Sequence, residues 1–426
     1  MRAKDLLQAL HAGQFDDRLR TVYGERSVAV AYGRIESVVN GFCEKFDREK
    51  TRDLMIFSAP GRTELGGNHT DHQGGWAIAG SVNMDTIACV ARRGDAVIRV
   101  QSKGHDLAEI DVSDKTIRES ERSRSQALLR GIAAKMGGLG HDIGGFDAYT
   151  ETRVLRGSGL SSSAAFEVLI GQIMNRLFCG GAFDSTDLAK IGQYAENVYY
   201  GKPCGLMDQM ACATGGVIAI NFADPKNPDV RRCAVDFAGE GYALVVIDSG
   251  ANHSDLDGEY AAITREMGAV AQFFGKERLH DVDEAAFDRR CDKVRAALGE
   301  RPALRAEHYF GETKRAVEQY EALERGDFAG YLALVRASGE SSEKKLQNVS
   351  VDRPGGDRLL RVIYRARELA GSTGAARVHG GGFAGTAQAY VPLERLDGFV
   401  SAMESEFDKG CCHIVQIRNV GSTQLI

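Results

Sequence analysis

Long apolar runs are missing from this sequence of 426 residues. Its longest runs, such as residues 243–247, fall far short of the roughly 20 apolar residues that a membrane-spanning helix needs. The N-terminal stretch, MRAKDLLQALHAGQFDD, interrupts its apolar positions with charges every few residues and lacks the apolar core of a secretory signal. We therefore expect a cytoplasmic protein that has no membrane partner.

Blocks of like charge are also missing. The 53 lysines and arginines nearly balance the 59 aspartates and glutamates, which leaves a net charge of −6. Because nucleic-acid binding relies on a concentrated basic surface, we expect no nucleic acid among the partners. The oligomeric state cannot be inferred from these features.

The cysteines lack the spacing of a disulfide framework or a metal site. There are nine of them, scattered, with no C-x-x-C pair, and the ten histidines do not supply the missing ligands. This pattern favours reduced, partly buried thiols in a cytosolic protein over a zinc centre. His69 and His72 lie three residues apart in a glycine-flanked loop without a carboxylate pattern, so we do not interpret them as a metal pair.

Hydrophobic periodicity predicts a mixed α+β protein. The first 50 residues read as helical, because Ile35, Val38, Val39, Phe42 and Phe46 share one face. A strand begins at Leu54, and its Pro-Gly pair at residues 60–61 predicts a turn there.

Later segments divide the chain in two. Helices are expected over 162–178 and about 187–199, and the region from 258 to about 370 reads as mostly helical. The polar stretch 222–240 reads as a turn-rich link. We therefore predict domains at 1–235 and 236–426.

The 50 glycines gather in clusters, and one cluster reads as a phosphate-binding loop. Residues 157–165, GSGLSSSAA, join a strand candidate to a helix, whose N-terminus offers unpaired N–H groups and the positive end of a dipole. The alternative is a plain serine N-cap, which needs only one of the three serines. The loop is not a Walker A motif, since no G-K-[ST] follows it.

A G-x-G-x-x-G pattern occurs at Gly380, Gly382 and Gly385, but the next residues, TAQAYVP, alternate like a strand. A dinucleotide fingerprint needs a helix there. The segment therefore predicts a glycine hairpin that packs against another loop.

Four segments follow one another along the chain: APGRTELGGNHTDHQGG at 59–75, GSGLSSSAA at 157–165, CGLMDQ at 204–209 and VHGGGFAG at 378–385. In this order they resemble the motifs of the galactokinases, a family of GHMP small-molecule kinases. The resemblance spans about 55–426, and the residues before it form a longer lead-in than is usual. It implies a two-domain fold: an N-terminal α+β domain with a left-handed crossover, a C-terminal ferredoxin-like domain, and an active site in the cleft between them.

The resemblance also implies the machinery of phosphoryl transfer. Asp208 matches the catalytic aspartate, which acts as the base or as the negative charge that activates the sugar hydroxyl, and Arg62 matches an arginine that stabilises charge on the phosphoryl oxygens. The alternatives are a helix cap for Asp208 and a surface ion pair for Arg62.

ATP and Mg²⁺ are the implied co-substrate and metal. Ser163 and Glu196 match the magnesium ligands, although a solvated helix position is the alternative for Glu196. The implied ATP-binding residues are Gly157, Ser158, Gly159, Leu160, Ser161, Ser162, Ser163 and Ala164.

A small-molecule sugar is the implied substrate. An aspartate that accepts from two vicinal hydroxyls distinguishes one epimer from another. The residues that match sugar-contacting positions are Asn68, His69, Thr70, Asp71, Gly205 and Tyr260.

The sugar-binding segment departs from the family pattern. Galactokinases typically have Glu at 68, Tyr at 72, Arg at 252 and Asn at 64, where this chain has Asn68, His72, Asn252 and Glu64. An amide at 68 both donates and accepts, so it admits a hydroxyl or a carboxylate at sugar C6. We expect phosphorylation of galactose at C1, with galacturonate or another sugar as the alternative. A non-catalytic sugar sensor is disfavoured, because the phosphate loop is intact.

Overall fold

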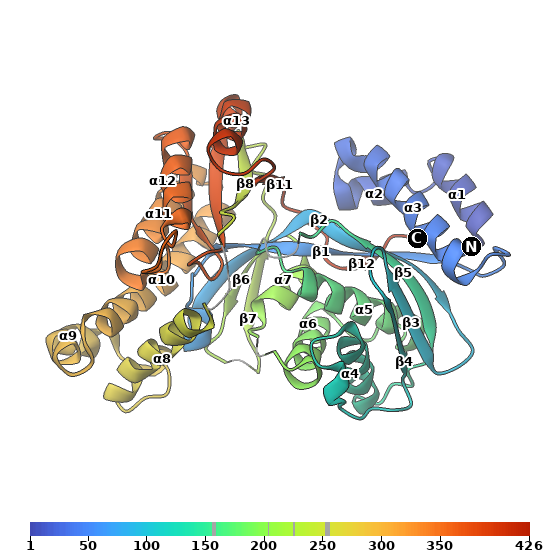
Figure 1. Ribbon diagram of the computed structural model, residues 1–426, viewed down its shortest axis with the longest axis horizontal. Coiled ribbons are helices and arrows are strands. Elements are labelled where there is room, and N and C mark those ends of the chain that lie inside the picture. The colour runs from blue at the N-terminus through green and yellow to red at the C-terminus, as the bar shows by residue number, and fades with distance from the viewer. Residues whose placement is uncertain (156–158, 203, 225, 252–255) are drawn as a thin grey trace.

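Two β-sheets with helices packed against them form the framework of the protein (Figure 1). The computed structural model describes residues 1–155, 159–202, 204–224, 226–251 and 256–426. Gly157, Ser158 and Asn252, which the sequence singles out, lie outside the described residues. Within the described part of the chain, no helix is both long enough and apolar enough to cross a membrane.

Within the described residues the larger sheet has eight strands, in the order β12-β1-β2-β5-β3-β4, and β6 pairs with both β2 and β7. Its strands are β1 (Met55–Gly66), β2 (Trp76–Arg92), β3 (Val97–Ser102), β4 (Leu107–Asp111), β5 (Phe146–Thr152), β6 (Val217–Asn221), β7 (Asp229–Cys233) and β12 (Thr423–Gln424). Strands β3 and β5 are parallel neighbours, so a crossover must connect them. Strand β4 and helix α4 (Ser125–Gly138) make that connection, which the family resemblance implies to be left-handed.

Strand β1 corrects the turn predicted at Pro60-Gly61, because the strand runs on to Gly66. Its pairing with β2 shifts register between Pro60 and Arg62, so an irregularity in the ladder takes the place of a turn. A Cβ on Gly61 would lie 2.6 Å from the carbonyl oxygen of Leu160. The glycine therefore allows the phosphate loop to approach the strand closely, and it does not end the strand.

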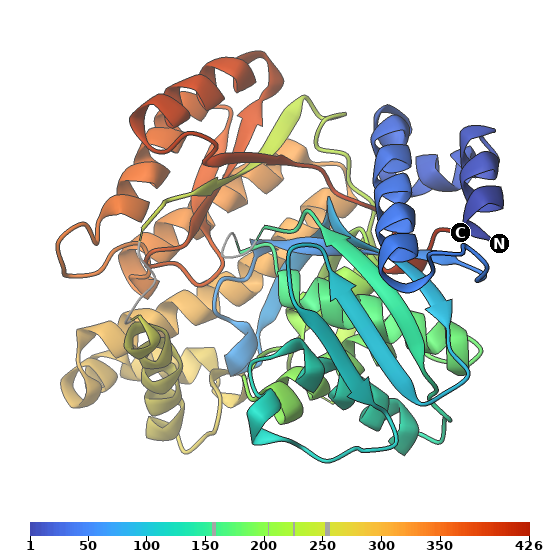
Figure 2. The same ribbon diagram turned by 45° about the vertical axis from the view of Figure 1, so that its right-hand side comes forward.

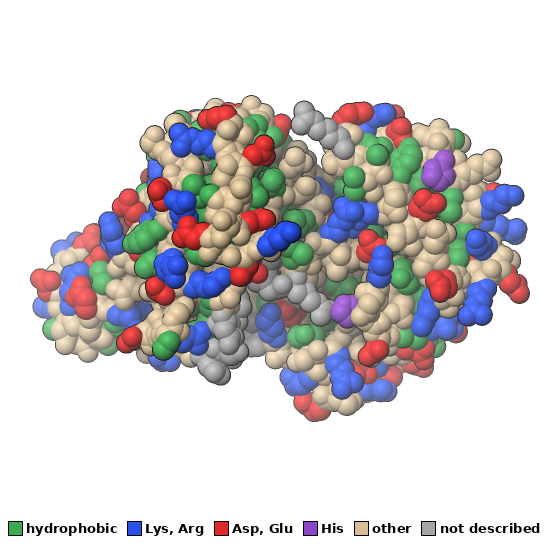
Figure 3. All heavy atoms as spheres, turned by 45° about the horizontal axis from the view of Figure 1, so that its top comes forward, with side chains coloured by type: hydrophobic (Ala, Val, Ile, Leu, Met, Phe, Trp, Pro, Cys, Tyr) green, Lys and Arg blue, Asp and Glu red, His purple; other side chains and the backbone are tan. Residues whose placement is uncertain are grey.

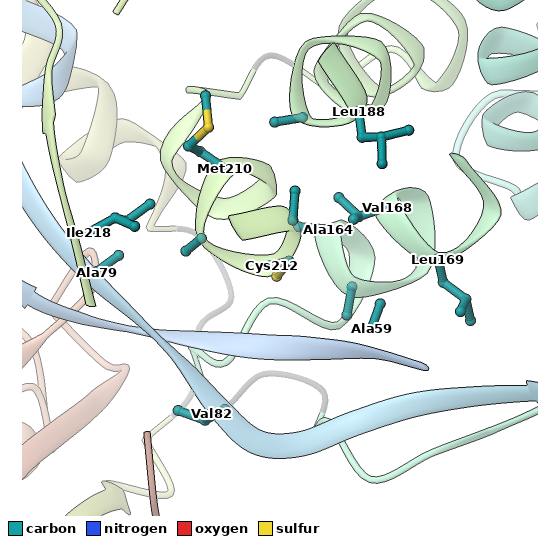
Figure 4. Close-up of a cluster of buried hydrophobic side chains, with 14 of the residues drawn as sticks. Ala59, Ala79, Val82, Ala164, Val168, Leu169, Leu188, Met210, Cys212 and Ile218 are labelled. Atoms are coloured by element: carbon teal, nitrogen blue, oxygen red, sulfur yellow. The ribbon is translucent and has the colours of Figure 1, made fainter. Parts of the chain in front are cut away.

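One face of this sheet is covered by α4, α5 (Ser162–Phe178), α6 (Ser185–Tyr194) and α7 (Met207–Thr214) (Figure 2). The predicted helix 162–178 is confirmed, and Ala165, Leu169 and Ile173 on its apolar face are fully buried. Figure 4 shows Ala164 and Val168 of α5 among Cys212 and other side chains of the same core. This core fixes where the N-termini of α5 and α7 lie.

The N-terminal helices α1 (Ala3–His11), α2 (Asp16–Tyr23) and α3 (Val28–Phe46) pack on the opposite side of the sheet, with α3 against β2 and β5 (Figures 1 and 2). The predicted apolar face is confirmed, since four of its five residues are buried and Phe46 is partly so.

The smaller sheet has the order β11-β8-β10-β9, with every pair antiparallel. It comprises β8 (Tyr242–Asp248), β9 (Ala375–His379), β10 (Thr386–Pro392) and β11 (Cys412–Val415), and α12 (Arg358–Ala370) and α13 (Leu396–Glu406) pack against it. In chain order the strands read 4-1-3-2, which is the expected ferredoxin-like arrangement. The predicted glycine hairpin is the loop between β9 and β10.

Helices α8 (Asp257–Phe273), α9 (Glu284–Leu298), α10 (Glu300–Glu324) and α11 (Phe328–Ser341) lie between β8 and β9 in the sequence, as predicted. Helix α10 contacts β1 and β2 of the larger sheet, and α11 contacts β9 of the smaller one. The predicted link 222–240 is more ordered than expected, because it contains β7. A division at residue 235 stays a prediction, since β12 at the end of the chain rejoins the larger sheet.

Candidate active site

Arg62 and Asp208 form an ion pair where β1 meets the start of α7. The Nε and Nη2 atoms of Arg62 lie 2.7 and 2.6 Å from Oδ1 of Asp208. The Arg62 side chain is 10% exposed and that of Asp208 is 33% exposed. The pair thus stands at the edge of the core, with the carboxylate within reach of a small molecule.

The phosphate loop is attached to the same pair. The Ser161 hydroxyl donates to Oδ2 of Asp208, and Nη1 of Arg62 donates to the carbonyl oxygen of Gly159. The backbone N–H of Arg62 also donates to Leu160, at 3.0 Å. Ser161 precedes α5 without capping it, so the plain N-cap alternative does not describe this serine.

Helix α5 presents its N-terminus at this point. Ser162, Ser163 and Ala164 form its first turn, whose N–H groups have no partners within the helix and favour an anion. Gly159 has a φ of +69°, and a Cβ there would lie 3.0 Å from the ring of His379. The base of the β9–β10 hairpin therefore packs against the phosphate loop, as the sequence predicts.

Two buried carboxylates lie behind the loop. Glu196 falls in a π-helical turn, Ala195–Tyr200, that follows α6, and it is 3% exposed, so the alternative of a solvated helix position is wrong. The side-chain amide of Gln209 donates at 2.9 Å to both Glu196 and Glu167. Burial, and next the Glu196 carboxylate, raise the pKa of Glu167 well above its usual range, and its Oε1 atom has no hydrogen-bond partner among the described residues.

The predicted sugar residues come from several elements. Asp71 begins a short 3₁₀ helix, Asp71–Gln73, and a Cβ on Gly205 would lie 2.9 Å from Oδ2 of Asp71. The Tyr260 hydroxyl donates to the Gly382 carbonyl at 3.0 Å. Thr70 is fully buried and donates to backbone carbonyls of its own loop, so its side chain shapes the loop.

His69 and His72 differ in what surrounds them. His69 Nε2 lies 3.1 Å from the carbonyl oxygen of Gly381, in the loop between β9 and β10. Burial lowers the pKa of His72 to about 4, although Asp71 acts in the opposite sense. His72 is therefore a neutral imidazole at physiological pH.

Asn68 is fully buried and its amide is already engaged. Its Nδ2 atom donates to Glu64 at 3.1 Å and to the Gly380 carbonyl at 2.7 Å, and its Oδ1 atom accepts from Asn348 at 2.9 Å. Direct contact with a substrate would require Asn68 to exchange one of these bonds.

Glu64 continues this network into the smaller sheet. Its carboxylate forms an ion pair of 2.9 Å with Arg377 on β9, and both side chains are buried. Gln388 on β10 donates to the Glu64 carbonyl and to Thr63, at 2.9 and 2.8 Å. Buried polar contacts thus join β1 to the smaller sheet directly beside the candidate site.

Sequence reasoning missed Glu167, Gln209 and Arg377. A signal for Glu167 was available, because it is a single acidic residue within an apolar helix. The pairing of Glu64 with Arg377 had no local signal, since 313 positions separate them.

Comparison with known proteins agrees with this arrangement. Residues 126–216 match the family described as GHMP kinases N terminal domain, and residues 40–92 match the galactokinase galactose-binding signature. The solved galactokinase of Lactococcus lactis, in complex with galactose, is 22% identical with a TM-score of 0.79, over 92% of this chain and 99% of that one. The mevalonate kinase of Methanococcus jannaschii is 14% identical with a TM-score of 0.61, over 87% and 99%. The fold is therefore that of the GHMP kinases.

A further relative identifies the family within the GHMP kinases to which the chain belongs. The galactokinase of Streptomyces coelicolor is 30% identical to this chain over 354 residues, which are 83% of this chain and 88% of the relative. Together with the galactose-binding signature, this similarity shows that the chain belongs to the galactokinase family.

Proposed function

We propose that this protein transfers the γ-phosphoryl group of ATP to the anomeric C1 hydroxyl of galactose and yields galactose 1-phosphate and ADP. The observation that carries the proposal is the bonding of Asp208 to both Arg62 and Ser161, which joins a carboxylate, a guanidinium and a phosphate loop at one point. The galactose named for the Lactococcus lactis relative supports the choice of sugar.

Asp208 is the proposed catalytic residue that receives the C1 hydroxyl proton, or that orients and polarises the hydroxyl. As the sugar oxygen bonds to the γ-phosphorus and the bond to ADP breaks, negative charge collects on the non-bridging oxygens. Arg62 lies where its guanidinium stabilises this charge, and its bond to Asp208 holds both groups in place before substrate arrives.

The ATP phosphates are proposed to lie at the N-terminus of α5. Backbone N–H groups and hydroxyls at Ser161, Ser162, Ser163 and Ala164 offer donors there, and Gly159 and Leu160 bring the loop onto Arg62. Gly157 and Ser158 are assigned to the same loop from the family resemblance alone.

Mg²⁺ is proposed to bind between Ser163 and Glu196. Glu196 and Glu167 supply hard carboxylate oxygens, and the unpartnered Oε1 atom of Glu167 fits a site that a cation or its water completes. The metal supplies charge neutralisation on the phosphates. Gln209, which bonds to both carboxylates, fixes their separation.

Asp71 is proposed to accept from vicinal sugar hydroxyls, and Gly205 leaves room for the Asp71 carboxylate. His69 and Tyr260 are proposed to flank the sugar from the side of the glycine hairpin. We assign Asn68 and Thr70 to the shape of this loop, because their side chains are already bonded within it.

Galactose is favoured over galacturonate by the same contacts. A C6 carboxylate would have to accept a hydrogen bond from the Asn68 amide. That amide already donates to the Glu64 carboxylate, at 3.1 Å. Galactokinases typically have Asn at 64 and Glu at 68, and this chain has the reverse. The two positions together therefore still supply one carboxylate and one amide. We propose that the reaction takes place in the cytoplasm, where ATP is available.

An ADP-release assay on the purified protein tests the proposal, with galactose, galacturonate, arabinose, glucose and N-acetylgalactosamine as acceptors. We expect galactose to give the highest kcat/KM, and phosphorus NMR to identify the product as the 1-phosphate. Absence of sugar-dependent ADP release would remove the kinase assignment, and a higher kcat/KM for galacturonate would replace the substrate.

A further inference from the structure

Asp85 is a buried carboxylate outside the candidate site that collects partners from widely separated parts of the chain. It lies on β2, is fully buried, and accepts from Ser58 on β1 and from Tyr23 on α2, the latter at 2.8 Å. Arg34 on α3 forms an ion pair with it, and Arg418, near the C-terminus, forms another at 3.1 Å. We call these five residues the Asp85 cluster.

The cluster carries charge in the interior. The Arg34 and Arg418 side chains are 6% and 0% exposed, so removing the shared carboxylate would leave two buried guanidinium groups without their anion. Burial alone would raise the pKa of Asp85, but the arginines outweigh burial and hold that pKa below its usual range. Asp85 is therefore ionised and constrained from several directions.

The backbone of Asp85 pairs with β1, the strand that carries Arg62. Asp85 stands opposite Pro60 in the pairing of β1 with β2, immediately before the register shift that separates Pro60 from Arg62. Its carbonyl oxygen accepts from the backbone N–H of Arg153 at 2.9 Å, and Arg153 directly follows the end of β5 at Thr152. The cluster thus holds both strands that lead into the site.

Attachment of the N-terminal helices does not by itself require these charges. Helices α1 to α3 already share an apolar core with the sheet, which includes Leu19 of α2 and Ile87 of β2. Burying a charged cluster costs desolvation that apolar packing avoids. Because the Asp85 cluster lies beside the register shift between Pro60 and Arg62, we infer a role that apolar contacts do not supply.

We propose that Arg34 and Tyr23 are positioning residues, through which the N-terminal helices fix the backbone that carries Arg62. The inference rests on the proposed kinase function for its effect on turnover. Through Asp85, they restrain the irregular pairing at Pro60 and the backbone at Arg153, and so set where the Arg62 guanidinium meets Asp208.

Steady-state kinetics of Arg34→Met, Arg34→Lys and Tyr23→Phe in the full chain test the proposal, with Leu19→Ala as the matched control. Leu19→Ala loosens the same helices without touching Asp85. Since small misplacements of catalytic groups cost up to about 100-fold in rate, we expect Arg34→Met to lower kcat about tenfold. The KM values for sugar and ATP should stay nearly unchanged, and Arg34→Lys should recover part of kcat.

Backbone amide exchange gives a readout that does not depend on activity. In Arg34→Met and Tyr23→Phe, the amides of Arg62 and Arg153 should exchange faster than in Leu19→Ala at equal global stability. Wild-type kcat in Arg34→Met, or a loss that Leu19→Ala reproduces, would overturn the proposal. If Arg34→Met does not fold, Tyr23→Phe decides. If the wild type phosphorylates no sugar, the kinase assignment fails, and amide exchange alone decides the positioning role.

Discussion

The side-chain amide of Asn68 donates a hydrogen bond of 3.1 Å to the carboxylate of Glu64. These are two of the positions at which the chain departs from galactokinases, and contact between them explains why the departures occur together. A carboxylate at 68 alone would face the Glu64 carboxylate inside the protein, and an amide at 64 alone would leave Arg377 without its anion.

We expect the two positions to be coupled in a double-mutant cycle that exchanges charge at constant volume. Asn68→Asp and Glu64→Gln should each destabilise the protein by about 2 kcal/mol or more, because each breaks a buried pair. The double variant should be more stable than the sum of the single effects by about 1 kcal/mol or more.

Denaturant unfolding of the four proteins measures this coupling. Additive losses would show that the contact has no energetic weight. The ratio of kcat/KM for galactose to that for galacturonate, measured in the same proteins, shows whether the pair also governs the C6 group.

The ion pair of Arg62 and Asp208 should be essential for turnover but not for ATP binding. Asp208→Asn and Arg62→Ala should each lower kcat by roughly 10²–10³, since groups that stabilise transition-state charge typically contribute that much. Calorimetry with ATP and far-UV circular dichroism check that binding and fold persist. Turnover close to that of wild type in either folded variant would remove this mechanism.

Activity should require a divalent metal, with loss on chelation and recovery on adding Mg²⁺ or Mn²⁺. Glu196→Gln should raise the Mg²⁺ concentration for half-maximal rate by about tenfold or more. Glu167→Gln should cause a smaller shift in the same direction. Glu119→Gln, at an exposed glutamate, is the charge-matched control. A metal titration that Glu196→Gln leaves unchanged would show that this carboxylate is structural only.

Stability should fall as the pH is lowered from 7 to 5. Burial, followed by the charges of Arg62 and Arg377, lowers the pKa of His379 well below its usual range. In the unfolded chain His379 therefore binds a proton near pH 6.5, whereas in the folded protein it stays neutral. The contribution of neutral His379 to the free energy of unfolding is fully present above that pH. Below it, the free energy of unfolding falls by up to about 1.4 kcal/mol per pH unit.

Thermal unfolding of His379→Asn across this range checks the assignment. The amide keeps a donor for Thr386, which His379 contacts at 2.8 Å, but has no proton to take up. We expect a shallower dependence of Tm on pH than in wild type or in His105→Asn, whose histidine is exposed. An unchanged slope would assign the effect to other groups.

The sequence predicted those parts of the fold that depend on local patterns. Helix 162–178 was found to the residue, because its apolar period and the serines before it coincide. The turn at Pro60-Gly61 was wrong because the glycine serves a close approach by Leu160, which local sequence cannot reveal. The raised pKa of Glu167 likewise depends on burial and on the Glu196 carboxylate, which approach one another only in the fold.

The family resemblance brought Arg62 and Asp208 to one site, and their contact is observed. It did not reveal that Asn68 would be enclosed. Its partners Gly380 and Asn348 lie 312 and 280 positions away, so no periodicity or motif could have placed them.

The buried bonds from Glu64 to Arg377, and from Gln388 back to β1, also limit how the two halves of the molecule move. Separating β1 from the smaller sheet here would break a buried ion pair and two buried hydrogen bonds together, at a cost of several kcal/mol. We therefore expect β1 and β9 to stay together while ligands bind and leave. Because β1 also carries Arg62, these contacts should hold the strand in place where Arg62 meets Asp208.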